Sequence, residues 1–131
     1  MLQIAQESGH RPVMARRIAE KQGISEPYID QLLIPLRTNG LIRSIRGRRG
    51  GYQLAADPRR LTVLDIVEAL DGRLSIIDCL DEQECTRQSV CATRVVWEQV
   101  ETVLRQQLSS TTLQDLLDIE QKMQIPNDYV I

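Results

Sequence analysis

Hydrophobic side chains recur at helical spacing in the first third of the chain and predict two helices joined by a short turn. The first helix is expected over residues 12–23, opened by Pro12 and closed by Gly23, with an inner side formed by Val13, Ile18 and Ala19. The second begins at the N-cap Ser25 and ends at Asn39 and Gly40; its apolar stripe consists of Ile29, Leu32, Leu33 and Leu36. Two helices joined by so short a turn must cross steeply, which is the helix-turn-helix arrangement.

The pattern then changes to the alternation that is typical of β-strands. Residues 41–45 alternate with a period of two, residues 46–51 form a basic, glycine-rich loop, and residues 52–54 resume the strand pattern. This order predicts a β-hairpin with arginines at its tip. Beside a recognition helix, such a wing reaches DNA phosphates or the minor groove.

Helical spacing returns in the second half of the chain. A short helix is expected from Thr62 to Asp71 and Gly72, and an irregular segment follows between Cys79 and Cys91. A helix of four to five turns comes next, with a wide apolar stripe made of Val95, Val96, Trp97, Val100, Val103, Leu104 and Leu108. Because a monomer of this size has little left to cover that stripe, we expect the helix to pair with its copy in a homodimer.

Thr112 and Asp115 have the spacing of a capping box and predict a last short helix, after which residues 126–129 are expected to fray. The predicted fold is mainly α with a small β-hairpin wing: a winged helix-turn-helix plus a long C-terminal dimerisation helix. We divide the chain into a DNA-binding domain (1–75), a cysteine-containing sensor loop (76–91), and the dimerisation helix with the C-terminal helix (92–131).

Composition supports a helical protein whose core is made of aliphatic side chains. Aromatic residues make up 3% of the 131 residues and Phe is absent, which disfavours an all-β sandwich. The chain has no apolar run long enough for a membrane span and no secretory signal at its start, so we expect a cytoplasmic protein without a membrane partner.

Charge is distributed unevenly along the chain. Residues 1–60 contain 11 Lys and Arg against 5 Asp and Glu, a net charge of +6, whereas residues 61–131 contain 5 against 13, a net charge of −8. A basic half that contains a winged helix-turn-helix favours double-stranded DNA as the partner. The residues expected to bind DNA are Ser25, Glu26, Tyr28, Asp30, Gln31 and Arg37 of the recognition helix, and Arg46, Arg48 and Arg49 of the wing.

Three cysteines, Cys79, Cys85 and Cys91, are evenly spaced in the predicted loop. Thiolates on a loop can converge on one centre, either an iron–sulfur cluster or a zinc ion, and both need a fourth donor. Redox-active thiols without metal are the alternative. The fourth donor stays open; the candidates are His10, Asp78, Asp81, Glu82 and Glu84.

A small metal-dependent enzyme or a cluster-transfer scaffold would also present three cysteines. The sequence has one histidine and no evident nucleophile and base pair, and neither class would explain the basic wing. We therefore predict a protein that is not an enzyme and has no small-molecule substrate.

Specific segments resemble the IscR and NsrR family of iron–sulfur transcription regulators. Ala19, Gly23 and Ile29 lie where a helix-turn-helix needs a small residue, a turn glycine and a core aliphatic. The similarity continues through residues 23–32 (GISEPYIDQL), 36–42 (LRTNGLI), 46–47 (RG) and 50–54 (GGYQL), and then through the three cysteines to Trp97 and the long helix. It covers nearly the whole chain.

This resemblance implies a dimeric repressor or activator, of which we favour the repressor, with a [2Fe–2S] or [4Fe–4S] cluster on Cys79, Cys85 and Cys91. Iron supply, oxygen or nitric oxide would alter the cluster and so the affinity for DNA. The resemblance also assigns base reading to Tyr28, Asp30 and Gln31, and minor-groove insertion to Arg46.

Three departures from the family pattern limit this transfer. Arg94 stands where the cluster-assembly member has its histidine ligand, and Asp30 replaces the usual Glu. The first five residues resemble the middle of the family's first helix, so the preceding turns are expected to be missing; some relatives take a ligand from that region of the partner subunit.

Overall fold

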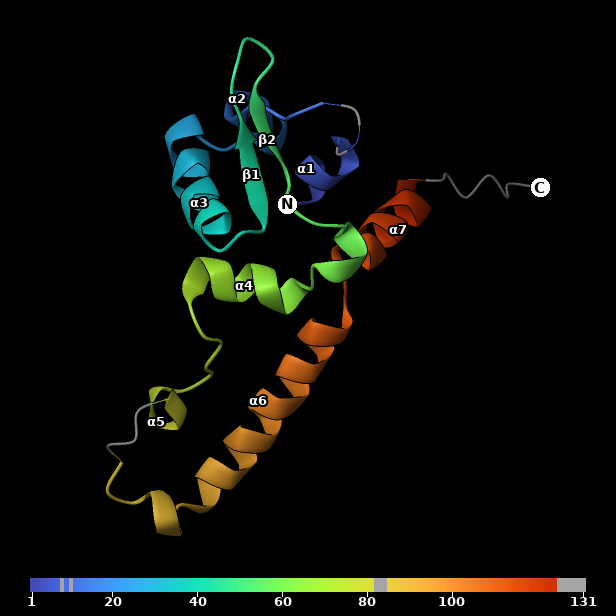
Figure 1. Ribbon diagram of the computed structural model, residues 1–131. Coiled ribbons are helices and arrows are strands. Elements are labelled where there is room, and N and C mark those ends of the chain that lie inside the picture. Colours follow the sequence, from blue (N-terminus) through green and yellow to red (C-terminus); the bar gives the residue numbers. More distant parts are fainter. Residues whose placement is uncertain (8, 10, 82–84, 125–131) are drawn as a thin grey trace, which may run out of the picture.

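Three helices and a hairpin form one end of the molecule (Figure 1). In this computed structural model the described residues are 1–7, 9, 11–81 and 85–124. The elements at this end are α1 (Leu2–Glu7), α2 (Ala15–Gln22), α3 (Glu26–Thr38), β1 (Ile42–Ile45) and β2 (Gly51–Leu54). The strands are antiparallel, with Ile42 opposite Leu54 and Ile45 opposite Gly51. The winged helix-turn-helix predicted from the sequence is thereby confirmed.

The other end is built around one long helix. The chain continues through η1 (Pro58–Arg60), α4 (Val63–Asp71), α5 (Asp78–Asp81) and η2 (Gln88–Val90) to α6 (Ala92–Ser110) and α7 (Leu113–Gln124). The predicted capping box at the start of α7 is present, since the Thr112 N–H donates to Asp115 and the Asp115 N–H donates to the Thr112 hydroxyl. Thr62 and Asp65 form a capping box of the same kind at the start of α4.

The buried core is aliphatic, as the composition predicts. Ile4, Val13, Ile42 and Leu113 are its most deeply buried large side chains, each no more than 2% exposed. Leu113 follows the long helix in the chain and yet packs in the core of the winged domain. The division into three parts at residues 75 and 91 stays a prediction.

Two backbone hydrogen bonds fix the point where α6 ends and α7 begins. The N–H of Leu113 donates to the carbonyl of Leu61 at 2.8 Å, and the N–H of Val63 donates to the carbonyl of Thr111 at 2.9 Å. α7 then lies against α1 and η1. The C-terminal end of the long helix is therefore attached to the winged helix-turn-helix.

The predicted start of the first long helix at Pro12 is wrong. α2 begins at Ala15, and Val13 instead forms an isolated antiparallel bridge with Tyr52. Both of its backbone groups pair with Tyr52, at 2.9 and 2.8 Å, and its side chain is 1% exposed. A β-branched residue that fills the core and extends the hairpin is more stable there than in a helical turn. The predicted end at Gly23 is confirmed by its left-handed φ of 65°.

No helix among the described residues combines the length and the apolar character that crossing a lipid bilayer requires.

Candidate nucleic-acid interface and cysteine loop

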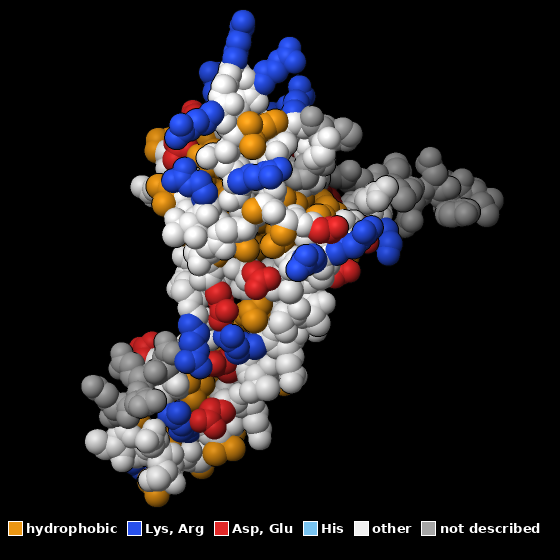
Figure 2. Space-filling model, in the orientation of Figure 1, with side chains coloured by type: hydrophobic (Ala, Val, Ile, Leu, Met, Phe, Trp, Pro, Cys, Tyr) orange, Lys and Arg blue, Asp and Glu red, His pale blue; other side chains and the backbone are white. Residues whose placement is uncertain are grey.

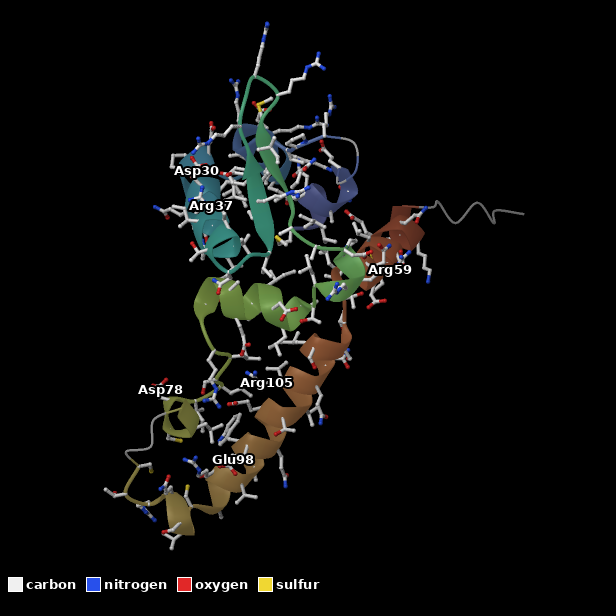
Figure 3. The ribbon with its side chains drawn as sticks, in the orientation of Figure 1. Asp30, Arg37, Arg59, Asp78, Glu98 and Arg105 are labelled. Carbon is white, nitrogen blue, oxygen red and sulfur yellow. The ribbon has the colours of Figure 1, made fainter. Side chains whose placement is uncertain are left out.

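One face of α3 is buried and the opposite face is exposed. Ile29, Leu33 and Leu36 point into the core. The exposed side carries the residues predicted to bind DNA: Ser25, Glu26, Tyr28, Asp30, Gln31 and Arg37. Figure 3 places Asp30 and Arg37 along this helix. A polar face next to a wing is the arrangement with which a recognition helix enters the major groove.

Arg46, Arg48 and Arg49 occupy the exposed tip of the hairpin. Figure 2 shows Lys and Arg side chains projecting from this end of the molecule. Among the described residues, none of these three guanidinium groups forms an ion pair. By contrast, Arg16 pairs with Glu20 at 2.9 Å in α2. The wing therefore offers three positive charges that no acidic side chain in the described residues neutralises.

Gly51 gives the wing its shape through a close contact of the backbone. A Cβ atom at this position would lie 2.5 Å from the carbonyl oxygen of Val13, and its φ of 148° is a conformation that favours glycine. Gly50 is similarly confined, because its Cβ would lie 2.3 Å from the carbonyl oxygen of Ile45. The glycines predicted to form a flexible tip thus also allow close backbone packing, which the sequence did not indicate.

The three cysteines lie along the segment that joins α4 to α6. Cys79 is in α5, Cys85 directly precedes a turn, and Cys91 is the N-cap of α6; all three are free and half-buried. The expectation of a wholly irregular segment is wrong, because α5 and η2 interrupt it. Within the described part of the chain, no three His, Cys, Asp or Glu side chains are grouped closely enough to hold a metal ion.

The candidate fourth donors fall into two groups. Asp78 is exposed on α5. His10, Glu82 and Glu84 lie outside the described residues, as does the side chain of Asp81. The donor set of three half-buried thiols suits a thiolate-rich group such as an iron–sulfur cluster. The loop would have to bring these thiols together to bind one.

Arg94 lies in the first turn of α6 and binds the cysteine segment directly. Its Nη1 donates to the carbonyl oxygen of Cys79 at 2.5 Å, and its Nε donates to Glu98 at 2.7 Å. A guanidinium has no lone pair to offer a metal at physiological pH. Arg94 therefore acts here as a hydrogen-bond donor to the loop.

The thiol of Cys91 has a polar neighbour at the start of α6. Its Sγ lies 3.1 Å from the hydroxyl oxygen of Thr93. This hydrogen bond lowers the pKa of the Cys91 thiol below its ordinary value, and the backbone N–H groups of Arg94 and Thr93 and the charge of Arg87 act in the same direction. A lowered pKa increases the fraction of reactive thiolate near neutral pH.

A second arginine of α6 joins three elements. Nη1 of Arg105 donates to Glu68 of α4 at 2.6 Å and to the carbonyl oxygen of Leu74 at 3.3 Å. The same carboxylate oxygen of Glu68 accepts the N–H of Leu74 at 3.1 Å. One residue later in α4, the carbonyl of Ala69 accepts a hydrogen bond of 3.4 Å from Asn39, which ends α3. These contacts form a connected path from α6 to the C-terminal end of α3.

The far side of α6 is apolar and uncovered. An open groove there is lined by Val96, Gln99, Val100, Val103, Leu104 and Gln107. Val103 is 65% exposed and Val96 is 57% exposed. The stripe predicted to pair with a second copy is thus exposed in the single chain, except for Leu108, which is half-buried.

Comparison with known proteins identifies the family. A family model named Rrf2 and described as an iron-dependent transcriptional regulator matches residues 1–119. The chain belongs to the Rrf2 family of transcription regulators. The sequence is 37% identical to the HTH-type transcriptional regulator CymR of Bacillus subtilis over 116 residues, covering 88% of this chain and 80% of the relative. It is 33% identical to the regulator IscR of Xenorhabdus nematophila over 125 residues, covering 95% of this chain and 76% of the relative.

Solved structures of Rrf2 regulators have the same fold. T. potens IscR aligns with a TM-score of 0.80 and 38% identity, covering 98% of this chain and 85% of that one. CymR of B. subtilis, described as its global cysteine regulator, aligns with a TM-score of 0.76 and 34% identity. The alignment covers 90% of this chain and 87% of CymR. These relatives are transcription regulators, so the expectations of a DNA-binding regulator and of a protein that is not an enzyme are confirmed.

Proposed function

We propose that this Rrf2 regulator is a cytoplasmic homodimer that represses transcription by binding an operator with α3 in the major groove and the wing in the adjacent minor groove. The observation that carries this proposal is the pairing of an exposed polar helix face with three wing arginines that have no acidic partner in the described residues. Gln31 is suited to an adenine and Asp30 to a cytosine, while Arg46 inserts into the minor groove.

The apolar groove of α6 supports dimerisation. Large side chains such as Val96 and Val103 stay exposed on a single chain, and their burial against the same face of a second copy would be favourable. The dimer would present two copies of α3 to half-sites about one helical turn of DNA apart.

We further propose that Cys79, Cys85 and Cys91 hold an iron–sulfur cluster that controls DNA affinity. The resemblance to iron–sulfur regulators and the description of the family as iron-dependent support this assignment. A bound cluster supplies a charge and a set of bonds that change with iron, oxygen or nitric oxide. Arg94 keeps the Cys79 carbonyl near α6, and the fourth ligand comes from elsewhere than position 94.

Thiol sensing without a cluster is the second candidate, because a specific observation favours it. The lowered pKa of Cys91 is the property of a redox-sensing thiol, and CymR, described as a cysteine regulator, is as similar in sequence as the IscR relatives. In this case Cys91 is the reactive residue.

Anaerobic purification followed by iron, sulfide and zinc analysis separates the two candidates. Visible absorbance that Cys85→Ala abolishes would support the cluster. Colourless, iron-free protein whose DNA affinity still responds to peroxide would support the thiol. A monomer that does not bind DNA at low salt would contradict the whole proposal.

A further inference from the structure

The segment between α4 and α5 is tied to α6 at both ends by arginines. Arg105 holds the carbonyl of Leu74, and Arg94 holds the carbonyl of Cys79. In Figure 1 the chain passes from α4 to α5 on one side of α6. We call residues 74–79 the strap.

The strap bridges two anchors that lie far apart along α6. Arg94 and Arg105 are about 16 Å apart along the axis of α6, because each helical residue rises 1.5 Å. Five residue steps of the strap would reach at most about 18 Å if they were fully extended. The strap is not fully extended, since residues 76 and 77 bend and Asp78 begins α5, so the long side chains of Arg94 and Arg105 span the remaining distance.

Glu101 lies on the same face of α6, between the two arginines. Glu101 is 7% exposed, and its Oε2 atom is buried without a hydrogen-bond partner among the described residues. Strap residues 74–77 are themselves half-buried. A buried carboxylate oxygen without a partner opposes the arrangement that buries it, because in water it would be fully solvated.

We infer that the strap is a conformational switch held near balance: Arg94 and Arg105 keep it docked on α6, whereas the buried carboxylate of Glu101 favours its release. Lifting the strap exposes Glu101 to water and frees Cys79 to move relative to Cys91. Docking has the opposite effect and holds the two cysteines at separate positions along the segment.

Release of the strap would also change the contacts of α3, the proposed recognition helix. Glu68 binds both Arg105 and the N–H of Leu74, so the strap's first residue is part of the α4–α6 contact. Ala69, next to Glu68, accepts from Asn39 at the end of α3. This transmission rests on the proposed function, whereas docking of the strap does not.

Hydrogen exchange measured by mass spectrometry on the full chain without DNA tests the switch. In Glu101→Met, which removes the carboxylate at similar length, the amides of residues 75–79 should exchange about tenfold more slowly than in the wild type. Glu101→Gln should slow exchange in the same direction. Arg105→Gln should accelerate it. Asp118→Asn on α7 removes one charge elsewhere and should leave the rates of residues 75–79 unchanged.

The outcomes are distinguishable from those for the proposed function. If folded Glu101→Met and Glu101→Gln exchange residues 75–79 as fast as the wild type or faster, the switch is refuted, whatever the protein does on DNA. If exchange slows as expected, the switch stands. DNA affinity should then change less between the signal-exposed and untreated forms of Glu101→Met than in the wild type, and an unchanged response would refute transmission to α3 alone.

Discussion

The carbonyl oxygen of Val13 lies 2.5 Å from the position that a Cβ atom on residue 51 would occupy. The two residues belong to different parts of the winged domain. Next to this contact, the backbone N–H and carbonyl of Val13 both form hydrogen bonds with the backbone of Tyr52. The isolated bridge between Val13 and Tyr52 therefore depends on the absence of a side chain at Gly51.

Gly51→Ala should destabilise the protein by about 1–3 kcal/mol, because the methyl group collides with backbone and the φ of 148° is strained for alanine. Urea unfolding measures the loss. Gly47→Ala is the matched control: its φ is 115°, but the added Cβ meets nothing within 4 Å, so its loss should be smaller. Equal losses would mean that the Val13 contact is unimportant.

Replacing Arg46, Arg48 and Arg49 by Ala should weaken DNA binding for all sequences and make it less sensitive to salt. Each lost phosphate contact lowers the slope of log affinity against log salt by about 0.9. Binding titrations at several salt concentrations measure this slope. Arg59→Ala on η1, distant from the wing in Figure 3, should leave it unchanged. A slope insensitive to the wing substitutions would argue against the wing as a DNA contact.

Gln31→Ala should relax specificity at one base pair of each half-site, at a cost of about 1–3 kcal/mol for the preferred operator. Competition between the operator and its single-base variants measures this loss. Arg37→Ala, in the last turn of α3, should weaken all of these DNAs to a similar extent. If Gln31→Ala weakens every variant equally, Gln31 does not read a base.

Cys91 should be alkylated faster by iodoacetamide at pH 7 than Cys79 or Cys85 in metal-free, reduced protein. Its pKa is lowered by the Thr93 hydroxyl, so its rate should begin to rise at a lower pH than that of an ordinary thiol. Mass spectrometry of timed samples gives the three rates. Thr93→Val should slow Cys91 selectively, and a Cys91 that reacts slowest would contradict the assigned pKa direction.

Glu68→Gln should destabilise the protein at neutral pH but not in strong acid. The hydrogen bond from Arg105, helped by the Leu74 N–H, lowers the pKa of Glu68 in the folded state. The resulting stabilisation is complete above the unfolded value of about 4.3 and disappears as the pH falls through the lowered pKa.

Unfolding free energies at pH 7 and pH 3 should therefore differ more for the wild type than for Glu68→Gln. Glu20→Gln removes the ion pair between Glu20 and Arg16, in which both side chains are exposed. It should therefore have a smaller effect on the free energy of unfolding. A Glu68→Gln variant with unchanged stability at pH 7 would exclude a structural role for the Arg105 contact.

Local signals in the sequence predicted the helix boundaries that depend on nearby residues. Gly23 ends α2 with a left-handed φ, and the Thr112 and Asp115 pair begins α7, each within four residues of the feature that it determines. The exposed face of α3 followed from the same periodicity. Such features need no knowledge of the remaining chain.

Contacts between distant residues escaped prediction. Val13 leaves the helical pattern because Tyr52, far along the chain, offers it a backbone partner. Arg105 and Glu68 are 37 residues apart, and neither stands out in the sequence. Arg94 was recognised as the residue in place of a histidine, but its bond to the Cys79 carbonyl depends on how the loop folds back.

The attachment of Leu113 to Leu61 has a mechanical consequence. α6 contains 19 residues and is therefore about 28 Å long, with one end pinned to the winged domain and the other carrying the cysteines. A rotation of about 5° at the pinned end moves the other end by about 2.5 Å for a rod of this length. A displacement of ångström size near Cys91 therefore corresponds to a small change of angle at the proposed DNA-binding surface.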